Sequence, residues 1–197
     1  MQAPKSKRWN RRVLLIVAVS LLQGCSALPQ LVRHSDPLTA EEHVKLGTSY
    51  EVQGQKDYAV QQYKAALHLQ KNNIPALVSW GNLAFENADW KNAEACYRRI
   101  LRLEPTHAGA NNNLAMVYLS TGKHIGKAET LVQIALKQGG PLKPYALDTL
   151  ATIYIQEGRF PEAQKALDEA TAPENNQQLR DQLAKTREKL VHSRIGV

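Results

Sequence analysis

The feature that most constrains this chain is a pattern of residues that returns about every 34 positions. The first copy consists of Leu46, Gly47, Tyr50, Gly54, Ala59, Tyr63 and Ala66. The second consists of Trp80, Gly81, Ala84, Ala88, Ala93, Tyr97, Ile100 and Pro105. The third consists of Leu114, Ala115, Tyr118, Gly122, Ala128, Val132 and Ala135, and the fourth of Leu150, Ala151, Tyr154, Gly158, Ala163, Leu167 and Ala170. A fixed period of this length indicates stacked units, each of which buries its apolar face only against its neighbours.

One position in every copy lacks bulk, and it is occupied by Gly47, Gly81, Ala115 and Ala151. A residue of this size allows a second helix to approach closely, and the aromatic residues of each copy then fill the space beside it. The first two intervals are 34 residues and the third is 36. We expect the extra residues in loops, before Ala128 and in Gly139-Gly140-Pro141, where they alter the twist between the third and fourth units.

These four copies resemble the signature of tetratricopeptide repeats (TPRs), and the resemblance covers residues 40 to about 177. It implies an all-α solenoid of four helix-turn-helix repeats at about 40–73, 74–107, 108–142 and 144–177. Thr39 and Glu42 have the spacing of a capping box, which predicts that the first helix starts there. Residues 175–192 carry leucines on an otherwise charged segment and are expected to form a capping helix that closes the last apolar face, so that the domain spans 39–192.

The first 38 residues follow a different pattern. Five cations, with no acidic residue among them, precede an apolar run from Val13 to Leu22. Ten helical residues cover roughly half of a hydrocarbon core about 30 Å thick, so the run fits the centre of a secretory signal peptide better than a membrane span. The following Leu22-Gln23-Gly24-Cys25 resembles the lipobox of bacterial lipoproteins.

The lipobox resemblance implies that residues 1–24 are removed, that Cys25 carries the lipid, palmitate included, and that residues 25–38 form a tether. Ser26 implies, by the same resemblance, the outer membrane, with the protein facing the periplasm. The alternatives are an uncleaved anchor or a coincidental cysteine.

The distribution of charge and the absence of catalytic motifs in the sequence argue against nucleic-acid binding and enzymatic activity. The net charge is +7, but without the five N-terminal cations 20 basic residues face 18 acidic ones, which leaves no footprint for nucleic acid. The six histidines are scattered, and no metal-binding, nucleophile-elbow or phosphate-loop motif is present. We therefore expect no enzymatic activity, no metal or other cofactor and no small-molecule substrate.

In TPR proteins the concave surface is lined by the first helix of each repeat, and partners bind there. On this sequence the resemblance places in that groove Val44, Thr48, Val78, Asn82, Phe85, Asn112, Met116, Leu119, Asp148, Thr152 and Ile155. None of these residues is Lys or Arg, which argues against clamping of a C-terminal carboxylate. The amides of Asn82 and Asn112 are expected to bond the backbone of a bound segment, although Asn is also common at the repeat positions of Asn82 and Asn113.

The leading hypothesis is a membrane-tethered adaptor that binds protein partners of the cell envelope. It resembles the TPR lipoproteins that act as pilotins in type IV pilus biogenesis, which implies a role in assembling a pilus or secretion machine. The alternative is an adaptor that recruits a peptidoglycan hydrolase or a protease to the membrane.

We predict that Cys25→Ser abolishes acylation and releases the chain from the membrane. Each buried acyl methylene contributes about 0.8 kcal/mol, so several chains anchor stably, whereas the near-neutral body should not bind lipid. Fractionation after a high-salt wash measures the effect. A Cys25→Ser variant that remains with the outer membrane would show that the anchor lies elsewhere.

Overall fold

The computed structural model describes residues 36–196, so the predicted signal peptide and Cys25 lie outside the described residues. The described part is helical, as predicted, and contains no strand. Its elements are α2 (Ala40–Val52), α3 (Lys56–Leu69), α4 (Ile74–Glu86), α5 (Trp90–Leu103), α6 (Ala108–Thr121), α7 (Ile125–Gln138), the short 3₁₀ helix η1 (Gly140–Leu142), α8 (Lys143–Gln156), α9 (Phe160–Glu169) and α10 (Gln177–Ile195).

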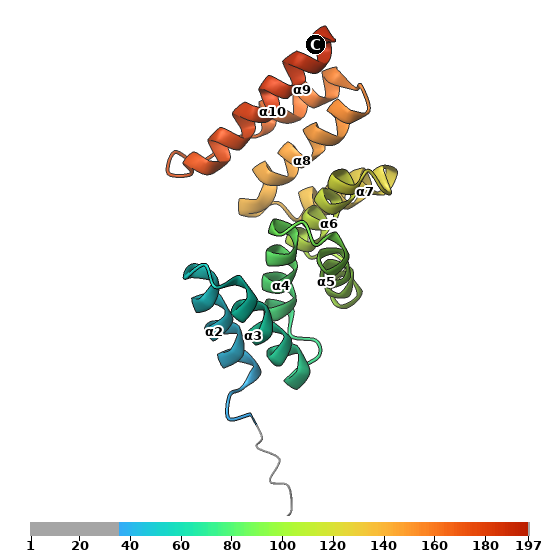
Figure 1. Cartoon of the computed structure of the whole chain (residues 1–197). Helices are drawn as coiled ribbons and strands as arrows, with labels where there is room; N and C mark the ends of the chain where they lie inside the picture. The colour runs from blue at the N-terminus through green and yellow to red at the C-terminus, as the bar shows by residue number, and fades with distance from the viewer. Residues whose placement is uncertain (1–35, 197) are drawn as a thin grey trace, which may run out of the picture. The chain divides into compact units, whose positions relative to one another are not determined.

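The helices form four consecutive antiparallel hairpins, α2–α3, α4–α5, α6–α7 and α8–α9, followed by α10 (Figure 1). Within this unit each hairpin packs against the next, because the second helix of one contacts the first helix of the following one. The first helices α2, α4, α6 and α8 also contact one another in that order. They therefore form one layer of the solenoid, with the second helices on its other side.

The first two hairpins close where a glycine of the first helix meets a tyrosine of the second helix. A Cβ atom added to Gly81 would lie 2.8 Å from Cε1 of Tyr97 and 3.1 Å from Cβ of Cys96. The same atom on Gly47 would lie 2.5 Å from Cε1 of Tyr63. Both tyrosines are fully buried. The rings thus occupy the space that the missing side chains leave, as the sequence predicts.

Local signals set the helix ends. The capping box at α2 is present: the Thr39 hydroxyl accepts from the Glu42 backbone N–H at 3.2 Å, and the Glu42 carboxylate accepts from the Thr39 N–H at 2.8 Å. Gly122 ends α6 with a φ of 66°, a left-handed conformation that glycine adopts without a Cβ clash. Both predicted insertions fall in the connections between α-helices, and residues of the second one contribute to η1.

The capping helix α10 begins at Gln177 and ends at Ile195, slightly later at each end than predicted. Asn176 caps it by accepting from the Leu179 N–H at 3.0 Å. Its buried stripe consists of Leu179, Leu183, Thr186 and Leu190. Val191, one of its apolar residues, lies outside that stripe and is 55 % exposed, because one residue corresponds to about 100° of helix rotation. The helix packs against α8 and α9, as a cap of the solenoid should.

We predict that Gly81→Leu lowers the free energy of unfolding by about 1 to 3 kcal/mol or more, because the new side chain overlaps the buried ring of Tyr97. Urea unfolding followed by circular dichroism measures this change.

Gly126→Ala is the matched control, since a Cβ on this helical glycine meets nothing within 4 Å. It should leave stability unchanged or raise it by up to about 1 kcal/mol. Equal midpoints for Gly81→Leu and the wild type would contradict the contact on which the repeat register depends.

Candidate functional site

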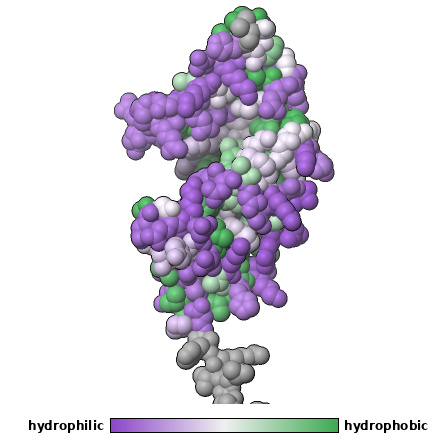
Figure 2. Space-filling model, viewed as in Figure 1, coloured by the Kyte–Doolittle hydropathy of each residue, from purple (hydrophilic) through white to green (hydrophobic). Residues whose placement is uncertain are grey.

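The predicted groove corresponds to the layer of first helices, and the molecular outline is hollowed on one side between α10 and the first hairpin (Figure 2). Eight of the predicted residues are at least partly accessible there. They are Val44 and Thr48 on α2, Val78, Asn82 and Phe85 on α4, Met116 and Leu119 on α6, and Thr152 on α8. We call this surface the groove.

Asn82, one of the two amide residues predicted to bind a partner, forms hydrogen bonds within the protein. The Oδ1 atom of Asn82 accepts from the Tyr97 hydroxyl at 2.9 Å and from Nδ2 of Asn113 at 3.0 Å. These two bonds connect α4 to its own hairpin partner and to the next repeat. The carbonyl oxygen of Asn82 is therefore occupied, which supports the structural interpretation of Asn82 and Asn113 over a role in accepting from a bound segment.

Three predicted groove residues are buried, namely Asn112, Asp148 and Ile155. Oδ2 of Asp148 accepts from Nε2 of Gln182 on α10 at 2.7 Å, whereas its Oδ1 atom is buried and has no hydrogen-bond partner among the described residues. Ile155 belongs to the hydrophobic core. Asp148 and Ile155 are therefore not accessible to a partner, and their placement in the groove was wrong because the sequence did not show how closely α10 packs on α8.

Asn112 is buried but borders a small pocket of about 160 Å³ between α6, α8 and α10. Its Nδ2 atom lies 3.4 Å from Oδ1 of Asn113 and 3.6 Å from Sδ of Met116. Its Oδ1 atom has no hydrogen-bond partner among the described residues. Sequence reasoning missed four further residues of this pocket, which are Leu142, Tyr145, Thr149 and Gln182.

A second hollow, of about 490 Å³, lies between α8 and α10. Apart from Thr152, its lining comes from α10, and includes Gln178, Asp181, Lys185 and Lys189. The sequence contains an indication that α10 lines the groove, because Gln177 lies 34 residues after Lys143. By this spacing α10 occupies the place of the first helix of a fifth repeat. The groove therefore extends onto the helix that was predicted only to cap it.

The electrostatic character changes along the groove. Neither α4 nor α6 contains a Lys or Arg, and α6 has no charged residue at all. By contrast, α10 brings charges of both signs, among them Asp181 and Lys185. The centre of the groove is thus apolar and amide-bearing, and charged residues lie on the helices at its two ends, α2 and α10. A carboxylate clamp therefore has no cation on α4 or α6 to form it.

Other chemistry has little support in the described residues. No group of three or more His, Cys, Asp or Glu within residues 36–196 is arranged to hold a metal ion. Cys96 is buried, and burial raises the pKa of its thiol to about 12, so it remains protonated. In the same part of the chain, no helix has the length and apolar character needed to cross a membrane.

Comparison with known proteins decides the fold. Residues 78–136 match the model of the tetratricopeptide repeat family. The structure of pilF from Pseudomonas aeruginosa superposes with a TM-score of 0.62 at 20 % identity, over 80 % of this chain and 74 % of that one. MamA from Desulfovibrio magneticus RS-1 gives a TM-score of 0.61 at 18 % identity, over 78 % and 92 % of the two chains. The fold is a TPR solenoid.

A curated relative outside bacteria leads to the same conclusion. The tetratricopeptide repeat-containing protein trd-1 of Caenorhabditis elegans is 25 % identical over 157 residues, which is 80 % of this chain and 20 % of that protein. The chain therefore spans about a fifth of the length of this relative, and what the two share is the repeat. The TPR fold supports a role as a scaffold for protein–protein interaction.

We predict that Asp148→Asn stabilises the TPR solenoid at neutral pH. Burial raises the pKa of Asp148 above its ordinary value, so the ionised carboxylate is disfavoured in the folded state while the Gln182 bond can persist with an amide oxygen. Because the folded protein takes up this proton at a higher pH than the unfolded chain, the penalty is full above the raised pKa and disappears as the pH falls below the unfolded value.

Urea unfolding of both proteins between pH 4 and pH 8 checks this prediction. The stability difference should be largest at pH 8 and should shrink on acidification. A difference that stays constant across this range would mean that the carboxylate of Asp148 is not disfavoured by its surroundings.

Proposed function

We propose that this protein is an outer-membrane-anchored periplasmic TPR scaffold that holds protein partners in its groove and assists the assembly of an envelope machine of the pilus or secretion type. The proposal combines a binding surface, argued from the structure, with an anchor and a cellular context, argued from the sequence. Each of these has its own support.

The observation that carries the binding function is the carbonyl oxygen of Asn112. It is buried at the edge of a groove pocket and has no hydrogen-bond partner among the described residues. Leaving such an acceptor unpaired costs about 1 to 3 kcal/mol, and a backbone N–H of a bound segment would recover that free energy. The pocket suits this occupant, because it is small and is bordered by Met116 and Tyr145, whose apolar atoms would contact the same segment.

The surroundings of the pocket define the segment further. The accessible residues of α4 and α6 near the middle of the groove include Val78, Phe85 and Leu119, which supply apolar contact. Neither α4 nor α6 carries a Lys or Arg that could pair with a negatively charged residue of the bound segment. A neutral, apolar segment in an extended conformation therefore fits the centre of the groove, with polar residues of the segment directed toward α10.

The anchor is supported by the lipobox-like residues before Cys25 and by the nearly balanced charge of the rest of the chain. Such a body has little electrostatic attraction for a lipid surface, so acyl chains on Cys25 would supply the membrane affinity. The pilus or secretion context rests on the joint occurrence of a lipobox and TPR repeats. The likeness to pilF is a likeness of fold. Recruitment of a peptidoglycan hydrolase or protease would use the same groove, and the identity of the bound protein separates the two.

Site-specific photo-crosslinking in cells tests the proposal. A benzoylphenylalanine at Met116, in the groove, should yield a covalent adduct with an envelope protein, whose identity mass spectrometry then provides. The matched control is the same substitution at Gln61, an exposed position on the second helix α3, and it should yield no adduct with that protein. Adducts at Gln61 but not at Met116 in a folded protein would move the partner surface away from the groove.

A further inference from the structure

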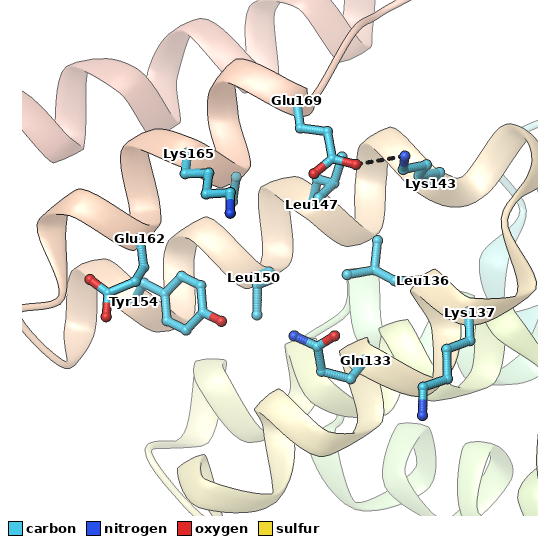
Figure 3. A pocket seen from close by; sticks show the side chains of 11 residues that line it. Gln133, Leu136, Lys137, Lys143, Leu147, Leu150, Tyr154, Glu162, Lys165 and Glu169 are labelled. Carbon is cyan, nitrogen blue, oxygen red and sulfur yellow. Dashed lines mark ion pairs between the residues drawn. The ribbon is translucent and has the colours of Figure 1, made fainter.

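A cleft of about 470 Å³ lies on the other side of the solenoid from the groove, bounded by the second helices α7 and α9 with α8 between them (Figure 3). We call it the rear cleft. Its volume is within the range of about 300 to 1,000 Å³ found for ligand sites. None of the residues predicted for the groove lines it.

The floor of the rear cleft is apolar. Leu147 and Leu150 of α8 lie at its base, and both are almost fully buried in the core. Leu136 of α7 adds a partly exposed wall. Figure 3 shows Leu136 and Leu150 directed into the same space, with Lys165 extending over it from α9. Such a floor accepts an apolar side chain, and burial of that side chain would contribute about 25 cal/mol per Å² of apolar surface.

The lining of the rear cleft contains three lysines and two glutamates, and two of the lysines form no ion pair with the described residues. Its two glutamates already have partners, since Lys143 Nζ lies 2.6 Å from Glu169 Oε1 and Arg159 Nε lies 3.1 Å from Glu162 Oε1. Lys137 and Lys165 form no ion pair within 4 Å with any residue that the structure describes. Two unpaired cations therefore remain beside an apolar floor, and this combination is complementary to carboxylates that flank an apolar residue.

The position of the rear cleft in the solenoid is specific. It lies at the junction of the third and fourth repeats, where the interval between repeats is 36 residues and η1 is inserted between α7 and α8. No other junction in the described part of the chain carries an additional helix of this kind. Among the described repeats, the rear cleft thus lies at the junction where the 34-residue period is interrupted.

We propose that the rear cleft binds an acidic segment of a partner protein, with a leucine or phenylalanine of that segment over Leu147 and Leu150 and its neighbouring carboxylates at Lys137 and Lys165. This surface differs from the groove in chemistry as well as in place, because the groove centre carries no cation. The scaffold then has two interaction surfaces, one for a neutral segment and one for an acidic segment.

Fluorescence anisotropy with the full chain in detergent micelles tests the proposal. The probe is a labelled peptide in which Leu-Phe is flanked by two glutamates on each side. One comparison peptide has Lys for every Glu, and the other has Ser for Leu and Phe. The acidic apolar peptide should bind at least tenfold more tightly than either, and its affinity should fall as NaCl increases from about 50 to 500 mM.

The decisive variant is Lys137→Glu with Lys165→Glu, which should weaken binding of the acidic peptide at least tenfold. Lys71→Glu with Lys127→Glu changes the net charge by the same amount at two exposed lysines outside both the cleft and the groove, and it should change the affinity less than twofold. A third variant, Met116→Glu, alters the groove and should leave peptide binding intact, so the two surfaces are tested separately. Circular dichroism verifies that each variant is folded.

Three results would overturn the proposal. The first is equal affinity of the wild type and the Lys137→Glu, Lys165→Glu variant. The second is equally tight binding of the peptide that carries Ser in place of Leu and Phe. The third is competition by phosphatidylglycerol vesicles that bind more tightly than the peptide and require the same two lysines, which would make the surface a membrane contact.

Discussion

The hairpins depend on one kind of contact, the close approach of two helices at a position where the first helix carries only Gly or Ala. At Gly81 and at Gly47 the ring of a buried tyrosine from the second helix fills the vacant space. The contact fixes more than a hairpin, because the hydroxyl of Tyr97 continues to Asn82, and Asn82 in turn accepts from Asn113 of the next repeat. The packing of Tyr97 in the core thus determines that the carbonyl oxygen of Asn82 is occupied.

The last helix, α10, both covers the final hairpin of the solenoid and lines the end of the groove. A solenoid exposes the apolar face of its final hairpin, and α10 covers that face with Leu179, Leu183 and Leu190. The same helix adds a polar contact between Gln182 and the buried carboxylate of Asp148. Such a contact adds little stability, since the carboxylate is desolvated, but it fixes the position of α10 against α8. Both hollows of the groove lie beside this helix.

The two surfaces of the solenoid differ because its two layers differ in sequence. The first helices α4 and α6 are almost free of charge, whereas the second helices carry most of the lysines and arginines of the four hairpins. In a regular repeat, the charged and apolar residues of the second helices would occupy equivalent positions in every hairpin. The insertion at η1 interrupts that regularity and coincides with the rear cleft, where Lys137 and Lys165 lie beside leucines of α8.

The sequence by itself determined the repeat, the positions of the hairpins, the capping box at Thr39 and the loops that accept insertions, because each depends on residue size and local backbone preference. The TPR resemblance also predicted the groove on the first helices, which the structure arranges in one layer. The sequence did not determine which groove positions stay accessible: Asp148 and Ile155 have the correct spacing but are buried, and Asn82 has the correct chemistry but is already bonded. Accessibility and hydrogen-bond pairing depend on the packing of α10 and on contacts between residues about 30 positions apart, such as Asn82 with Asn113. A repeat pattern reports the interactions that recur in every unit, and only the tertiary structure decides those that occur once.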